Sequence, residues 1–201
     1  MTYYTLSDPC TATLEIKKSQ FLGFGFAIDS REQLMFHVEQ LRNQYPDARH
    51  VCYGYIIGDP HNTTSAGFDD DGEPSGTAGK PILNVLQHKG IGNCVAIVVR
   101  YFGGIKLGAG GLTRAYSSSA QAVVDNMNLH AFVPLSVIMI ETDFANESFV
   151  RHTLDGFNAT ILKVDYGKNV VLTVELAQKS VQVLSEKIGF YGNVKASEEP
   201  K

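Results

Sequence analysis

The chain has 201 residues, a formal net charge of −4 and a hydrophobic content of 44%. This length is enough to bury a core without covalent staples, and it suits one large or two small domains. The negative net charge excludes a basic field over the whole molecule, so any contact with nucleic acid must come from a local patch.

The cysteines and the N-terminus indicate the compartment. Cys10, Cys52 and Cys94 lie far apart and show no metal-binding spacing, which favours free, buried thiols in a reducing environment. The N-terminus lacks the basic start and apolar core of a signal peptide. No apolar run has the length of a bilayer span. We therefore expect a cytoplasmic protein that has no membrane partner.

The first quarter of the chain predicts strands and one helix. Apolar patterning predicts strands over residues 11–17, 21–28 and 51–57. Ser30 is a good N-cap, and Gln33 completes a capping box for a helix that extends to about residue 44. His50 stands beside Arg49 at a strand start, and we interpret it as a structural or solvated histidine rather than a catalytic one.

An acidic segment follows at residues 67–83, with the sequence GFDDDGEPSGTAGKPIL. Its turn-forming composition predicts a loop, followed by a short helix from Lys80 to near Gly90. Packed acids can hold a divalent cation, but an EF-hand would need ligands at Gly67 and Ala78. Hydroxyl nucleophiles need a base that the sequence does not identify. The residues to be considered in this loop are Asp70, Asp71, Glu73, Ser75 and Thr77.

A glycine-rich segment, VAIVVRYFGGIKLGAGGLTRAY, occupies residues 95–116. Its apolar start predicts a strand buried on both faces, and helical spacing resumes at Leu112. The start of a helix offers free N–H groups and a partial positive charge to an anion. The segment is not a P-loop, because Ala109 and Gly110 replace the Lys and Ser/Thr. Thr113 likewise replaces the last glycine of a dinucleotide motif.

After Pro134 the pattern becomes regular. It predicts strands over residues 135–144, 159–166, 170–176 and 193–196, and helices over 146–156 and 179–188. The order β-α-β-β-α-β is that of a ferredoxin-like domain. No catalytic constellation is predicted in this half, so its expected work is packing or recognition.

Residues 70–83 and 98–116 together resemble the signatures of the IMPACT protein family, in its bacterial, YigZ-type branch. KKSQF at 17–21 and DARH at 47–50 support the match. The resemblance implies an α+β protein, with a ribosomal-protein-S5 domain-2-like domain over 1–131 and a small ferredoxin-like domain over 132–201. The pair is similar to the fourth and fifth domains of elongation factor G.

The resemblance also bears on function. Eukaryotic IMPACT proteins bind the activator of a starvation-responsive initiation-factor kinase, and they associate with ribosomes and actin. No catalytic residues are established for the family, so it transfers none. We expect a non-catalytic, translation-linked protein that binds RNA, the ribosome or a translation-associated protein, with no cofactor, metal or DNA specificity. The candidate phosphate-binding residues are Lys80, Arg100, Lys106, Gly108, Gly110, Gly111 and Arg114.

Two alternatives remain open at this point. Residues 108–113 resemble the phosphate loop of a kinase superfamily that shares the S5-like fold, and the acidic loop would then bring Mg²⁺. This reading predicts an enzyme that binds a nucleotide or another phosphate ligand. A protein-interaction scaffold instead predicts that both motifs are structural, with Arg100 or Arg114 paired to Asp71 or Glu73.

Overall fold

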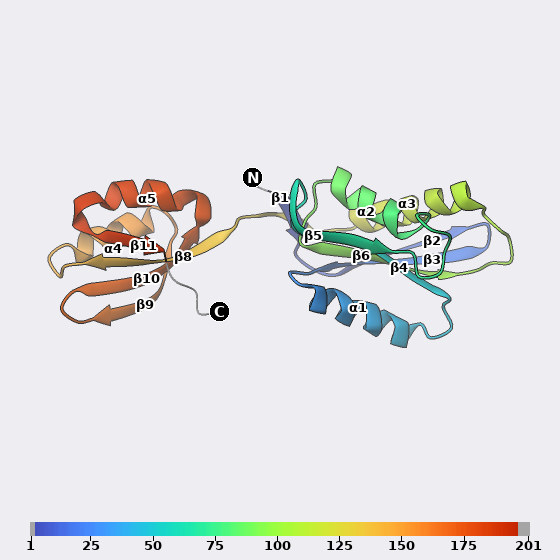
Figure 1. The fold of residues 1–201 in the computed structure, drawn as a ribbon, viewed down its shortest axis with the longest axis horizontal. Coiled ribbons are helices and arrows are strands. Elements are labelled where there is room, and N and C mark those ends of the chain that lie inside the picture. Colours follow the sequence, from blue (N-terminus) through green and yellow to red (C-terminus); the bar gives the residue numbers. More distant parts are fainter. Residues whose placement is uncertain (1–2, 197–201) are drawn as a thin grey trace. The chain divides into compact units, whose positions relative to one another are not determined.

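The structure is a computed structural model that describes residues 3–196. The chain forms two compact units, Met1–Phe132 and Val133–Lys201, which we call the N-terminal and C-terminal units. Each has its own sheet and its own hydrophobic core (Figure 1). Within residues 3–196, no helix is both long and apolar enough to cross a membrane.

The N-terminal unit is built on a five-stranded sheet in which all neighbouring strands are antiparallel. The strands, in spatial order, are β2 (Cys10–Ile16), β3 (Ser19–Ala27), β6 (Cys94–Tyr101), β4 (His50–Asp59) and β5 (Asn62–Asp69). Helix α1 (Arg31–Gln44) covers one face, and α2 (Gly79–His88) and α3 (Ala109–Asp125) cover the other (Figure 1). A separate two-stranded sheet pairs β1 (Tyr3–Leu6) with β7 (Leu129–Phe132).

The pattern of β6 explains why helices cover both faces of this sheet. Side chains alternate between the two faces of a strand, so a continuous apolar run must be buried on both. Val95, Ile97 and Val99 pack with α1, whereas Ala96 and Val98 pack with α2 and α3. Strand β6 therefore contributes side chains to the hydrophobic cores on both faces of the sheet.

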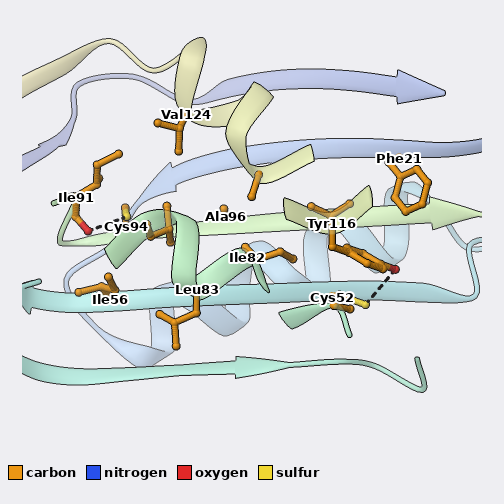
Figure 2. Packing of buried hydrophobic residues seen from close by; sticks show 14 of the residues in the cluster. Phe21, Cys52, Ile56, Ile82, Leu83, Ile91, Cys94, Ala96, Tyr116 and Val124 are labelled. Atoms are coloured by element: carbon orange, nitrogen blue, oxygen red, sulfur yellow. Dashed lines mark hydrogen bonds between the residues drawn. The ribbon is translucent and has the colours of Figure 1, made fainter. Parts of the chain in front are cut away.

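Tyr116 on α3 lies at one end of the core between the sheet and the helices α2 and α3. It is completely buried and meets the Phe21 ring edge-to-face, with 5.3 Å between the ring centroids. The Cys52 thiol donates to its hydroxyl oxygen over 3.4 Å (Figure 2). The polar end of Tyr116 thus lies where the apolar core ends.

The C-terminal unit has the ferredoxin-like order that the sequence predicts. Its elements are β8 (Leu135–Thr142), α4 (Glu147–Asp155), β9 (Thr160–Tyr166), β10 (Val170–Ala177), α5 (Val181–Ile188) and β11 (Asn193–Ala196), with short 3₁₀ turns at Gln178–Ser180 and Gly189–Tyr191. The strands are antiparallel in the order β11-β8-β10-β9. The α+β class, with an S5 domain-2-like unit and a ferredoxin-like unit, is confirmed.

Three local predictions need correction. The acidic loop was expected to start at Gly67, which is wrong because β5 continues to Asp69, whereas the helix expected from Lys80 is present as α2 and begins at Gly79. Strand β5 itself was not predicted, since NTTSAGFD lacks apolar alternation. The last glycines of the glycine-rich segment lie inside α3, which begins at Ala109. By contrast, the Ser30 cap is confirmed, with its Oγ accepting from the Gln33 N–H over 3.3 Å.

Candidate functional site

Three side chains stand in a row at one end of the sheet of the N-terminal unit. Arg100 on β6 is the direct register partner of Phe21 on β3 and of His50 on β4. Directly opposite residues on antiparallel strands share a face, so all three point toward the side covered by α3. The sheet thereby delivers one cation and one imidazole to the end of the apolar core.

The acidic loop places Glu73 above this row. Arg100 Nη1 and the Tyr116 hydroxyl both donate to Glu73 Oε1, the latter over 2.8 Å. The Glu73 and Arg100 side chains are only 4% and 7% exposed. A buried ion pair of this kind is costly to break, because either partner alone leaves an uncompensated charge. The pair ties residues 69–79 to residues 100–116, and so the two motifs touch.

Tyr116 enters this network as a donor. Burial raises the pKa of its phenol, and the neighbouring Cys52 and Glu73 raise it further, so the hydroxyl keeps its proton. Burial likewise raises the pKa of the Cys52 thiol, which therefore remains a neutral donor to Tyr116. The hydrogen bonds therefore run from the Cys52 thiol to the Tyr116 hydroxyl, and from that hydroxyl to the Glu73 carboxylate.

His50 is held in one orientation by the same loop. Its Nδ1 lies 2.8 Å from the carbonyl oxygen of Asp71. Because a carbonyl only accepts, Nδ1 carries the proton, and in the neutral ring Nε2 is the acceptor. Nε2 lies 4.0 Å from Glu73 Oε1. His50 is therefore structural on one side and open to a ligand on the other.

The acidic loop is organised around Asp70 as a helix cap. Its carboxylate accepts from the N–H groups of Gly76, Ala78 and Gly79 over 2.7–3.0 Å. These donors include the start of α2, where a carboxylate satisfies free N–H groups and favours the helix dipole. Asp70 therefore builds the loop, and its oxygens are already committed to the backbone.

Asp71 has a similar structural role. Its carboxylate accepts from the Val51 N–H over 2.6 Å and from Arg42 Nη2 over 2.8 Å. Its own backbone has a positive φ of 41°. Among residues 3–196, no group of three or more acidic, His or Cys side chains is arranged to hold a metal ion. These contacts give Asp71, like Asp70, a structural role in the loop.

The glycine-rich segment crosses directly over the β2–β3 turn. A Cβ on Gly103 would overlap the backbone of Lys18, and the Gly103 N–H donates to Ser19 Oγ over 3.1 Å. Gly104 and Gly108 have φ values of 86° and 70°, which glycine adopts readily. Gly108 is the N-cap of α3 and provides no side-chain cap. The first N–H groups of α3 therefore have no partner within the helix.

A cavity of about 380 Å³ lies between the two motifs. Its walls are Arg49, His50, Glu73, Arg100, Phe102 and Lys106, together with the start of α3. Arg49 and Lys106 are exposed, so the rim is cationic. A larger hollow of about 960 Å³ in the C-terminal unit is lined by Glu175 and Glu186 and has no cation in its wall. We therefore place the candidate site in the N-terminal unit.

Six of the seven predicted phosphate-binding residues lie in the cavity wall or in the first two turns of α3. Lys106 and Gly108 line the cavity. Gly110 and Gly111 form the first turn of α3, and a Cβ on Gly110 would lie 4.0 Å from Arg114 Nη1, so that guanidinium reaches back over the helix start. Arg100 lines the cavity but is buried and paired with Glu73, as the scaffold reading predicts.

The other predicted residues lie outside the cavity wall. Lys80 is exposed in the first turn of α2. Ser75 is exposed in the loop, whereas Thr77 is buried and donates from Oγ1 to the Pro74 carbonyl over 2.6 Å. Thr77 therefore closes a turn.

Sequence reasoning missed two features of the site. Phe102 was not considered, although an aromatic residue directly before a glycine pair is a usable signal of an exposed ring. The turn formed by Lys17 and Lys18 was predicted, but not its position beside Gly103. These two lysines have φ values of 48° and 64°, which are unfavourable for non-glycine residues, and both are exposed. The cationic face thus extends beyond the cavity rim.

Comparisons with known proteins agree with this architecture. The model of the Impact N-terminal domain matches residues 17–124, and a domain of unknown function, DUF1949, matches residues 140–189. The chain is 37% identical to IMPACT family member YigZ of Escherichia coli K12, over 90% of this chain and 88% of that protein. It is 30% identical to IMPACT family member YvyE of Bacillus subtilis 168, over 92% of this chain and 84% of that protein.

A solved structure described as that of a hypothetical protein is also similar. It has a TM-score of 0.73 and 33% sequence identity, and the match covers 99% of this chain and 98% of that one. The likeness therefore extends through both units as well as through the two motifs. The chain belongs to the IMPACT family.

Proposed function

We propose that this protein is a non-catalytic, translation-linked binding protein that contacts RNA phosphate on the ribosome through the cavity face of its N-terminal unit. The observation that carries the proposal is the uncapped start of α3 in a cavity whose exposed charged side chains are Arg49 and Lys106. Family membership supports the link to translation.

The charges of this face favour an anion although the whole chain is acidic. The acid in the cavity wall is neutralised, since Glu73 is paired with Arg100, and Asp71 of the same loop is paired with Arg42. The cations Lys106, Arg114 and Arg49 remain exposed. Free N–H groups at a helix start and adjacent cations are the usual elements of a phosphate site. The local field is therefore positive on a molecule of net charge −4.

Co-sedimentation of the full chain with purified ribosomes over a salt series tests the proposal. We expect binding to weaken as salt rises, because phosphate contacts release counterions. A Lys106→Ala, Arg114→Ala variant should bind more weakly and lower the slope of log K against log salt by roughly 1 for each lost contact.

The matched control is Lys89→Ala with Lys168→Ala, which removes the same charge from exposed positions at the far end of α2 and in the β9–β10 turn. This control should bind like the unmodified chain. Equal loss in both variants would assign the effect to net charge alone. Unchanged binding in the Lys106 and Arg114 variant would place the contact elsewhere, and salt-independent binding would indicate a protein partner.

A further inference from the structure

We propose that the cavity holds one unstacked nucleotide of single-stranded RNA, with its base against Phe102 and its phosphate at the start of α3. This inference rests on the proposed function and gives it a ligand chemistry. The cavity offers a ligand more than a charged surface, since its volume of about 380 Å³ lies within the range of small-molecule sites.

Phe102 provides the stacking surface. Its side chain is 49% exposed although it forms part of the cavity wall. The Arg100 guanidinium carbon lies 5.7 Å from the centroid of this ring and 5.5 Å from that of Phe21. One buried cation thus lies against a core ring and an exposed ring, which fixes Phe102 relative to the sheet. Fixed aromatic rings and arginine planes are the surfaces on which splayed-out RNA bases stack.

Unused polar atoms lie next to this ring. Both donors to Glu73 within residues 3–196 use Oε1, which leaves the lone pairs of Oε2 for another donor. The Nε2 atom of His50, whose Nδ1 faces the Asp71 carbonyl, is a second polar atom in the cavity wall. These polar atoms in one cavity suit the edge of a base, which carries amino and ring N–H groups beside acceptors.

The phosphate position follows from another part of the cavity wall. Lys106, Gly108 and Ala109 line the cavity, and the first turn of α3 is made of Ala109 and two glycines. Glycines leave the backbone N–H groups accessible to a phosphate oxygen. A mononucleotide unit therefore spans the cavity from a cationic helix start to an aromatic wall.

The test measures the affinity of the full chain for a labelled single-stranded RNA dodecamer by fluorescence anisotropy, with an RNA duplex of the same length as comparison. We expect the single strand to bind at least about 5-fold more tightly, because a paired and stacked base cannot enter the cavity. Phe102→Leu should weaken single-strand binding by at least about 5-fold, the lower end of the range for loss of base stacking. Duplex binding should not change.

Phe36→Leu is the matched control, since Phe36 is 58% exposed on α1, which covers the opposite face of the sheet. It should bind like the unmodified chain. Thermal unfolding of each variant confirms that it is folded. Titration with a free nucleoside monophosphate separates the two sources of a nucleotide: binding as tight as that of the dodecamer would mean that the ligand is a free nucleotide and would overturn the RNA assignment.

Failure of this inference can be told from failure of the proposed function. If ribosome and RNA binding depend on Lys106 and Arg114 but Phe102→Leu and strandedness have no effect, phosphate contact stands and the base pocket is wrong. If the chain binds neither ribosomes nor RNA at low salt, both proposals are wrong.

Discussion

Replacement of Glu73 by Gln is the sharpest perturbation of the buried network, because it keeps the size of the side chain and removes its charge. Arg100 would then remain 7% exposed without an opposing charge. Breaking a buried ion pair costs about 3–5 kcal/mol. A domain is usually stable by only about 5–15 kcal/mol, so this loss would leave the N-terminal unit marginally folded.

Urea unfolding followed by near-ultraviolet circular dichroism measures this change. The chain has no tryptophan, and seven of its nine tyrosines lie in the N-terminal unit, so the tyrosine signal reports mainly on that unit. Glu15→Gln, an exposed carboxylate on β2, is the control and should change the free energy of unfolding by less than about 0.5 kcal/mol.

A double replacement separates the cost of an isolated charge from the value of the pair. Glu73→Leu with Arg100→Met removes both charges, and buried pairs replaced in this way often lose little stability. We therefore expect the double variant to be more stable than Glu73→Gln. An unchanged urea midpoint for Glu73→Gln would show that Arg100 is not held as a buried cation compensated by Glu73.

Two further predictions use the same urea titration. A Cβ on Gly103 would overlap the Lys18 backbone, so Gly103→Ala should lower the free energy of unfolding by about 1–3 kcal/mol. Gly110 has open space in α3, so Gly110→Ala should raise it by about 0.5–1 kcal/mol. Equal effects of the two substitutions would contradict the close approach of Gly103 to Lys18. Burial raises the pKa of Cys52 and of Tyr116 above the ordinary values of 9.0 and 10.0, so above those pH values the unfolded chain releases protons that the folded chain keeps. Stability should therefore fall by up to about 1.4 kcal/mol per pH unit for each group, and a flat profile from pH 8 to pH 11 would contradict the burial of this network.

The sequence predicted the elements whose patterns are local. The β6 run, the Ser30 capping box and the ferredoxin-like order all follow from residue spacing, and the structure has them. Strand β5 was missed because its residues carry little apolar alternation, and its pairing with β4 depends on the completed sheet. Propensity cannot identify a strand that tertiary contacts impose.

The candidate site was predictable in its parts but not in its assembly. The two motifs were identified, and a pairing of Arg100 with Glu73 was among the alternatives. Sequence spacing could not show that Arg100 is buried or that His50 is its cross-strand partner, because register is a property of the sheet. Nor could it show that the Asp70 carboxylate accepts from N–H groups at the start of α2. The role of Asp70 depends on which backbone N–H groups the folded chain leaves without a partner.

Titration of the full, ¹⁵N-labelled chain with the single-stranded RNA dodecamer, followed by amide chemical shifts, tests the central claim most directly. We expect the largest shifts on the first turn of α3, at Ala109, Gly110 and Gly111, and on the adjoining residues Phe102 and Lys106. Shifts confined to the C-terminal unit, or to the α1 side of the sheet, would contradict that claim.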